Sequence, residues 1–423
     1  MKTAGRFLLS TTLAAAACGP GDETCDPSAP GTICTIAGIP ETSGYDGDAP
    51  RDALDARMSL PQDVLPDGQG NLYIADWNNH RIRRLGPDGT IAWVAGQGEI
   101  GGTLDDPANN DFNHLTTLIW DCQTGEDLVV AAWHNSKIRT LDLDTGAIID
   151  TCGDGRRAYF GDDGPADVAA LDLPASVACA PDGGLVVMDQ ANQVIRRIDD
   201  EGVITRMAGQ CIIDAAPPNG PGPCETPVQC PGGSGKWTCG DPEATCGSPC
   251  TPSFNGDGLP ALETRLAQPF GQSAPPAGRI LYDRDGNLLF ADTSNHVIRR
   301  LNAGDGTVEI IAGTPPEGGV AQSGYAGDGG PATAALLNGP VDLALADDGT
   351  LYVSDVNNHC VRAIAPDGTI DRVVGRCGER GFEGDGGAPL DALLKLPFGI
   401  HLDGDVLYVA DSGNHVIRSV NLE

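Results

Sequence analysis

A fourteen-residue string that recurs six times constrains the fold of this chain more than any other feature. The copies read LYIADWNNHRIRRL from Leu72, LVVAAWHNSKIRTL from Leu128, LVVMDQANQVIRRI from Leu185, LLFADTSNHVIRRL from Leu288, LYVSDVNNHCVRAI from Leu351 and LYVADSGNHVIRSV from Leu407. They recur with a period of about 57 residues, apart from one longer gap. A period of this length predicts an array of similar structural units.

Each copy predicts two β-strands joined by a tight turn. The first part, such as LYIAD, is a short apolar run, and the part after the turn alternates between apolar and polar residues. A third strand follows in segments such as GTIAWVAG at 89–96, and another apolar stretch precedes each copy. Four short antiparallel strands per repeat are typical of a propeller blade, so we expect an all-β fold.

The last copy lacks the third strand, whereas a spare third-strand segment, GTICTIAG, lies at 31–38 before any blade begins. We expect residues 31–38 to be the outer strand of the last blade, because this pairing leaves no unpaired sheet edge there. The sequence therefore predicts a six-bladed β-propeller of four-stranded antiparallel blades over residues 31–423, closed by an N-terminal strand.

The recurring strings NHRI, NHVI and NHCV resemble the NHL repeat. The stretch GYAGDGGPATAALLNGP at 324–340 is similar to NHL propellers of teneurin-like and bacterial extracellular proteins. This resemblance covers residue 31 to the end, apart from one insertion, and implies the propeller fold. It does not imply a ligand, because propellers host many unrelated functions. Some NHL-like propellers are lyases that hold a metal with His, but His114, His134 and His401 outside the repeat form no convergent set.

The N-terminus and the charge indicate where the chain acts. Lys2 and Arg6 precede a short apolar run, which is typical of a signal peptide over 1–17. The string LAAAAC resembles a bacterial lipobox, which implies lipidation of Cys18 and a tether over 18–30. Cleavage without lipidation is the alternative. Acidic residues outnumber basic ones by 59 to 26, and this charge disfavours a nucleic-acid partner. The predicted location is the bacterial cell envelope, with membrane contact only through the lipid.

The 14 cysteines predict disulfides, because an exported chain folds in an oxidising compartment. Six of them lie in a Pro- and Gly-rich insertion at 211–252, between blades 3 and 4, and their pairing is left open. Zinc binding there is the alternative, but the insertion has no two CxxC motifs. Outside the insertion, and apart from Cys18, the candidate pairs are Cys360 with Cys377, Cys122 with Cys179, and Cys25 with Cys34. Cys152 is left over.

Polar residues that recur once per blade are expected to be structural. An Asn and an Arg occur in all six copies and an Asp in five, and we expect the Arg to pair with an Asp where blades meet. Gly-Asp loops such as GYAGDGGPA precede most blades. No cofactor is predicted, and Ca²⁺ is the alternative to a tight turn in these loops, with candidate ligands Asp46, Asp48, Asp162, Asp257, Asp328 and Asp385.

Blade 2 departs most from the repeat, so it is the candidate ligand site. Trp133 and His134 occupy its turn, Trp77 occupies the matching turn of blade 1, and His114 is near in sequence. Exposed Trp side chains there would stack on a sugar or bind a partner, and the alternative is that each Trp packs onto its neighbouring loop. The sequence therefore favours an exported module that binds a protein or glycan on this loop face. The alternative is a metal-dependent lyase or hydrolase in the central channel.

Overall fold

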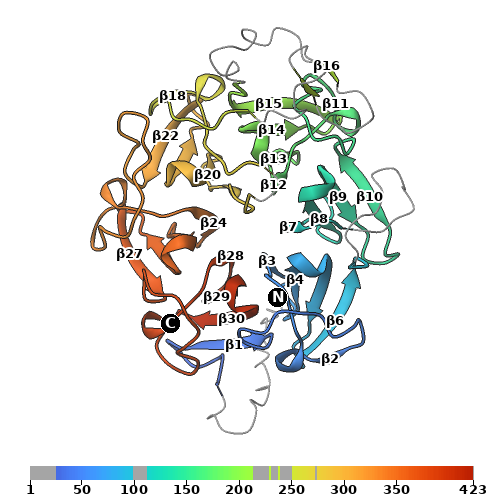
Figure 1. Cartoon of the computed structure of the whole chain (residues 1–423), viewed down its shortest axis with the longest axis vertical. Helices are drawn as coiled ribbons and strands as arrows, with labels where there is room; N and C mark the ends of the chain where they lie inside the picture. Colours follow the sequence, from blue (N-terminus) through green and yellow to red (C-terminus); the bar gives the residue numbers. More distant parts are fainter. Residues whose placement is uncertain are drawn as a thin grey trace, which may run out of the picture.

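Six β-sheets of the chain are arranged as a ring around a central axis (Figure 1). A further two-stranded sheet pairs β16 (Val228–Gln229) with β17 (Trp237–Thr238) in the insertion. A computed structural model describes residues 25–98, 112–212, 228–229, 237–238, 250–271 and 274–422. The prediction of a six-bladed propeller is confirmed. Within these described residues, no helix is long and apolar enough to span a bilayer.

Each blade has four antiparallel strands that run from the axis outward, in chain order. Blade 1 consists of β3 (Asp63–Pro66), β4 (Leu72–Asp76), β5 (Arg81–Leu85) and β6 (Thr90–Ala95). Blade 2 consists of β7 (Leu115–Trp120), β8 (Leu128–Ala132), β9 (Lys137–Leu141) and β10 (Ile148–Cys152). Blade 3 consists of β12 (Pro174–Cys179), β13 (Leu185–Asp189), β14 (Val194–Ile198) and β15 (Val203–Gly209).

The second half of the ring repeats this order. Blade 4 consists of β19 (Ile280–Tyr282), β20 (Leu288–Asp292), β21 (Val297–Leu301) and β22 (Thr307–Ala312). Blade 5 consists of β24 (Pro340–Leu345), β25 (Leu351–Asp355), β26 (Cys360–Ile364) and β27 (Thr369–Val374). Blade 6 consists of β28 (Pro397–Asp403), β29 (Val406–Asp411), β30 (Val416–Asn421) and the N-terminal β1 (Ile33–Ala37).

The closing strand is in the predicted place. β1 pairs antiparallel with β30, and Ile33 lies opposite Val420. Figure 1 shows β1 beside β30, although the two are at opposite ends of the chain. Ile33 is fully buried among residues of blades 5 and 6. The N-terminal segment therefore supplies both the outer edge and part of the core of blade 6.

Four blades carry a short fifth strand that the sequence did not predict. These two-residue strands pair with the outer strand of blades 1, 3, 4 and 5: β2 (Arg51–Asp52), β11 (Gly164–Pro165), β18 (Leu259–Pro260) and β23 (Gly330–Pro331). They belong to the segments that follow the Gly-Asp loops. Because each adds only two residues to the edge, a sequence pattern of strand length cannot reveal them.

The two faces of the ring carry different turns. The turns between the first and second strands of each blade, such as 67–71, lie on what we call the hairpin face. The opposite face, the loop face, carries a single 3₁₀ turn after the second strand of each blade, such as Trp77–Asn79. Each 3₁₀ turn ends in a left-handed residue, for example His80 with φ 54°. The left-handed residue reverses the chain into the third strand.

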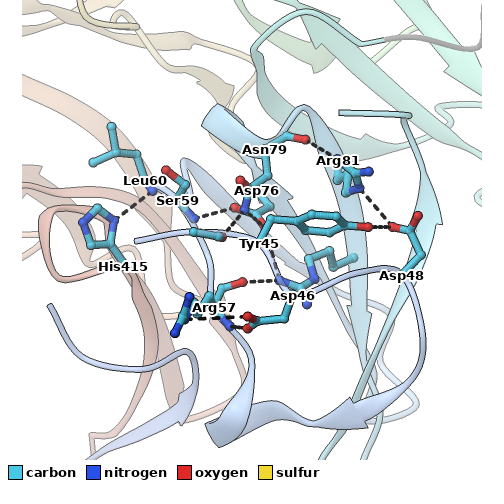
Figure 2. A network of polar contacts seen from close by, with 12 residues as sticks. Tyr45, Asp46, Asp48, Arg57, Ser59, Leu60, Asp76, Asn79, Arg81 and His415 are labelled. Atoms are coloured by element: carbon cyan, nitrogen blue, oxygen red, sulfur yellow. Dashed lines mark hydrogen bonds and ion pairs between the residues drawn. The ribbon is translucent and has the colours of Figure 1, made fainter. Parts of the chain in front are cut away.

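The His of the repeat joins neighbouring blades. The Nδ1 atom of His80 accepts a hydrogen bond of 3.0 Å from the backbone N–H of His114 in blade 2. His296, His359 and His415 accept equivalent bonds from Gly339, Leu396 and Leu60 in the next blade. Gln193 does the same with its side-chain oxygen, toward Gln268. One side chain in each of five blades thus ties that blade to the next, and the bond from Leu60 to His415 spans the ring closure (Figure 2). In blade 2 the matching residue is Ser136, and its buried hydroxyl has no hydrogen-bond partner among the described residues.

The recurring Asp, Asn and Arg connect segments inside one blade, so the prediction that this Arg pairs with an Asp between blades is wrong. In blade 5, Asp355 accepts hydrogen bonds from Asn338 N–H at 2.7 Å and from the Asn358 amide at 2.8 Å. Arg362 lies 3.8 Å from the same carboxylate and donates to the Leu336 carbonyl. The equivalent pairs are Asp76–Arg83, Asp189–Arg196, Asp292–Arg299 and Asp411–Arg418.

The apolar core lies between adjacent blades rather than at the axis. Blade 4 contributes Ala291 and Ile298 to one layer, and blade 5 contributes Leu343 and Val353 to the same layer. Full burial of such a side chain is worth about 1.5–3 kcal/mol, so each inter-blade layer contributes strongly to stability. The centre of the ring is consequently left to the side chains of the six inner strands.

All three candidate disulfides outside the insertion are present: Cys25–Cys34, Cys122–Cys179 and Cys360–Cys377. A fourth, Cys211–Cys250, joins the two ends of the insertion. Cys152 is free and buried, as expected, and burial raises the pKa of its thiol to about 12. Four disulfides are the signature of an oxidising compartment and indicate an exported chain. Most of the insertion, the signal segment and Cys18 lie outside the described residues.

Candidate binding site

The predicted loop-face residues meet in one cluster of aromatic rings between blades 1 and 2. The rings of Trp77 and His114 lie 4.3 Å apart, and those of Trp133 and His134 are stacked at 4.2 Å. The His114 and His134 rings also contact, with their Nδ1 atoms 2.9 Å apart. The sequence correctly grouped these four residues, but it did not predict the neighbouring His80, whose ring contacts that of His114.

The prediction that Trp133 is an exposed stacking platform is wrong. Trp133 is 1% exposed, and its indole N–H donates to the Gln190 side chain of blade 3 at 3.2 Å. It packs against Leu173, Ala175 and Ala191, which belong to the loop, the inner strand β12 and the 3₁₀ turn of that neighbouring blade. Trp77 is half-buried. The cluster therefore fills the junction between blades and offers little surface for a ligand.

The buried histidines of this cluster predict acid sensitivity. Burial, with the nearby Arg81, lowers the pKa of His80 to about 4, and burial with the neighbouring histidines lowers that of His114 to about 3. In the unfolded chain both take up protons near pH 6.5, so their contribution to stability is present above that pH and lost below it. Between pH 7 and pH 4, the wild type should lose about 3 kcal/mol more than His114→Asn.

Urea denaturation at several pH values measures this difference. Asn is a suitable replacement because His114 has φ 56°, a left-handed conformation that Asn tolerates. Parallel loss of stability in the two proteins would show that His114 is not kept neutral by the fold.

The Gly-Asp loops hold their carboxylates against basic side chains of the same blade. In blade 1, Asp48 accepts from Tyr45 and lies 3.0 Å from Arg81, and Asp46 contacts Arg57 (Figure 2). The Tyr45 ring lies under the Arg81 guanidinium at 3.8 Å. The side chains of Tyr45, Asp48 and Arg81 thus bind one another and fix the conformation of this loop.

The carboxylates of the other candidate calcium ligands are also bound to groups of the protein itself. Asp162 and Asp385 lie 2.7 Å from Arg196 and Arg418, and Asp328 contacts Arg362. Asp257 accepts the Ile310 backbone N–H at 2.7 Å. Across the described part of the chain, no group of three or more His, Cys, Asp or Glu side chains is placed to hold a metal ion. The loops therefore act as tight turns pinned by Asp, and the calcium hypothesis gains no support.

Arg279 divides the central channel. Its guanidinium lies 2.9 Å from Asp63 of blade 1 and 3.1 Å from Asp342 of blade 5, and both carboxylates are buried. Asp63 also accepts the Leu118 N–H of blade 2, and Asp342 accepts the Ile400 N–H of blade 6. On the loop side of Arg279 the channel narrows to a cavity of about 20 Å³. We call Arg279, Asp63 and Asp342 the axial triad.

On the hairpin side of the axial triad the channel widens into an apolar cavity of about 450 Å³, which we call the funnel. Its wall includes one apolar side chain from the inner strand of every blade: Leu65, Ile119, Val177, Leu281, Leu343 and Leu402. Trp120, opposite Leu128, and Leu345, opposite Leu351, also line the funnel and lie at the strand ends next to the hairpin turns. The funnel therefore opens on the hairpin face.

The polar groups of the funnel carry no free positive charge. Arg279 is neutralised by the two carboxylates of the axial triad. His401 also lines the funnel, and burial lowers the pKa of its imidazole to about 4, so it is neutral at pH 7. An apolar cavity with few polar groups is the usual form of a ligand site.

The sequence placed the binding site on the loop face and considered the central channel only for a metal-dependent enzyme, so it did not predict the funnel as a binding site. A usable signal existed: Asp63 and Asp342 occupy similar places in LPQDVLPDG and GPVDLALADDG. A carboxylate inside an otherwise apolar inner strand needs a partner, and that partner faces the axis. The sequence did not identify Arg279 as that partner, because Arg279 belongs to a third blade.

The comparisons with known proteins agree with this architecture. Residues 274–365 match the family model of the Teneurin NHL domain. Teneurin-1 of Gallus gallus is 23% identical over 399 residues, a match that covers 87% of this chain and 13% of the relative. Teneurin-3 of Mus musculus is 26% identical over 345 residues, covering 70% of this chain and 12% of the relative. The chain thus corresponds to a small part of these long proteins.

Solved structures show the same fold at low sequence identity. A protein of unknown function from Bacteroides thetaiotaomicron superimposes with a TM-score of 0.60 at 15% identity, covering 92% of this chain and 75% of its own. An auxiliary nutrient binding protein from Bacteroides ovatus gives 0.58 at 14% identity, covering 92% and 76%. These likenesses and the six repeated strings agree with the observed fold. The chain is a six-bladed β-propeller, and its residues 274–365 resemble the Teneurin NHL domain.

Proposed function

We propose that this chain is an exported, lipid-anchored binding module whose ligand enters the funnel from the hairpin face. The observation that carries the proposal is an apolar cavity of about 450 Å³ on the hairpin side of the channel, with Arg279 of the axial triad in its wall. An auxiliary nutrient binding protein among the propellers of like fold is consistent with this role. The predicted partner remains a protein or a glycan at the cell envelope.

The proposed anchor is a lipid on Cys18, followed by the tether at 18–30. The disulfide Cys25–Cys34 then fixes the end of the tether to the closing strand β1. Labelling with a fatty acid in bacteria tests the anchor, since Cys18→Ser should abolish it.

The alternative, a metal-dependent lyase or hydrolase in the channel, has weaker support. His401 is the one candidate His outside the repeat that lines the funnel, whereas His114 and His134 lie in the loop-face cluster. The charged side chains of Arg279, Asp63 and Asp342 are paired with one another in the axial triad. A binding role needs only the cavity, so it is the function that the geometry favours.

Titration with the neutral fluorophore N-phenyl-1-naphthylamine tests whether the funnel accepts an apolar ligand. We expect saturable fluorescence enhancement with the wild type. Leu345→Trp should weaken it at least tenfold, because Leu345 lines the funnel near its mouth and a larger side chain fills the space. Trp77→Ala on the loop face is the matched control and should bind as the wild type does. Equal binding by Leu345→Trp, with the protein folded, would refute a ligand site in the funnel.

A further inference from the structure

We infer that the ligand is a basic peptide segment that inserts an apolar side chain into the funnel and lays Lys or Arg side chains over an acidic groove beside it. This inference rests on the proposed function and adds the chemistry of the ligand. The observation behind the inference is a second cavity, of about 590 Å³, between the hairpin-face turns of blades 1 and 2. We call this cavity the acidic groove, because five carboxylates line it: Asp67, Glu126, Asp127, Asp142 and Asp144.

The acidic groove exists because blade 2 departs from the repeat on the hairpin face. Its first turn runs from 121 to 127, between Trp120 and Leu128, whereas the matching turn of blade 1 runs only from 67 to 71. The disulfide Cys122–Cys179 ties this longer turn to blade 3. The groove is therefore held open by a fixed loop of the one atypical blade.

The carboxylates of the groove differ from those of the Gly-Asp loops in having no cationic partner. Asp67 accepts from Asn71 and from backbone N–H groups, and Asp142 accepts from backbone N–H groups and from the Thr145 side chain. Glu126 and Asp144 are exposed. Among the residues that the structure describes, none of the five forms an ion pair, and no Lys or Arg lines the groove. Arg84 approaches the nearby Tyr73 but does not line the groove.

Trp120 joins the acidic groove to the funnel. It lines both cavities, donates its indole N–H to the Pro66 carbonyl at 2.9 Å, and contacts the edge of the Tyr73 ring at 5.3 Å. One fixed indole therefore separates an apolar cavity from an acidic one. Successive side chains of an extended peptide point to opposite sides and lie about 3.3 Å apart along the chain. Neighbouring residues of a peptide can thus occupy the two cavities at once.

The charge of the residues that line the two cavities indicates which class of ligand fits them. An anionic ligand would meet five unpaired carboxylates and find the Arg279 charge already neutralised. A neutral apolar ligand would fill the funnel but leave the groove unused. Several cationic groups next to an apolar side chain satisfy both cavities, and a basic peptide carries them on one backbone. The net charge of -33 adds a long-range attraction for such a partner.

Fluorescence anisotropy with the folded mature chain tests the inference. The probe is a labelled peptide of sequence Lys-Lys-Leu-Lys-Lys, compared with the same peptide carrying Ser for Leu or Glu for Lys. We expect both changes to weaken binding at least tenfold. Removal of two groove charges in Glu126→Gln with Asp144→Asn should weaken the basic peptide about tenfold, while binding of N-phenyl-1-naphthylamine in the funnel stays unchanged.

A matched pair controls for net charge. Asp200→Asn with Glu201→Gln removes the same two charges from an exposed turn between β14 and β15, outside the groove, and should leave peptide binding unchanged. Equal effects of the two pairs would overturn the inference, as would binding of the neutral probe without any binding of the peptide. Both results leave the funnel as a binding site. Failure of Leu345→Trp to block the neutral probe would instead refute the proposed function itself.

Discussion

Arg279→Met is expected to lower the free energy of unfolding by about 3–5 kcal/mol, because it leaves the buried carboxylates of Asp63 and Asp342 without a cation. Both Asp side chains hold backbone N–H groups of neighbouring blades, so their displacement loosens blades 1, 2, 5 and 6 together. Chemical denaturation of the purified chain at pH 7 measures the change. A more acidic solution should reduce the deficit, since burial raises the pKa of Asp342 to about 7 and protonation of this carboxylate removes its unpaired charge.

Arg284→Met is the matched control for this experiment. Arg284 also pairs with an Asp of blade 5, Asp347, but both side chains are largely exposed, at 65% and 104%. A surface pair of this kind is worth about 0–1 kcal/mol. If the two Arg variants lost the same small amount of stability, the axial triad would not be important for the stability of the ring.

Deletion of residues 25–38 is expected to remove about 5 kcal/mol or more of stability. The deletion strips β1 from blade 6, exposes the ladder of β30 and empties the buried site of Ile33. An unpaired edge strand also promotes association between chains. Thermal unfolding and the oligomeric state of the variant report both effects.

A circular permutation tests whether β1 stabilises the fold through its pairing with β30 or through its position in the chain. Residues 25–38 joined after 422 by a flexible linker can still pair with β30, and this variant should regain most of the lost stability. A deleted chain that stays monomeric with an unchanged melting temperature would contradict the closing role of β1. A permuted chain as unstable as the deleted one would show that the fourteen residues need their original connection.

Periodic features of the sequence were predicted correctly because each depends on local pattern. Apolar runs and turn residues recur in every copy, and hydrogen bonds between neighbouring strands make each blade a local unit. The spare segment at 31–38 and the incomplete last copy then identify β1 as the partner of β30. The three disulfides followed from the same strand map, because Cys122 and Cys179 fall at equivalent places in adjacent blades.

The errors concern residues whose surroundings come from another blade. Trp133 looked exposed because its turn is exposed in a single repeat, but the loop and turn of blade 3 cover it and Gln190 accepts its N–H. The repeat Arg was expected to bridge blades, whereas the His does so. Whether the Arg or the His side chain reaches the next blade depends on the distance between the blades, and the sequence of a single repeat does not give that distance.

The sequence by itself determined the blades, their number, the closing strand and the oxidised cysteines, since these depend on contacts within one repeat or between adjacent repeats. Only the tertiary structure decided what lies on the axis. Asp63 and Arg279 are 216 residues apart in the chain, yet ring closure brings them within 2.9 Å. The funnel arises in the same way, because its wall combines side chains from all six blades and exists only once the ring is closed. The acidic groove needs only the packing of blade 2 against blade 1, but its wall also combines side chains from separate repeats.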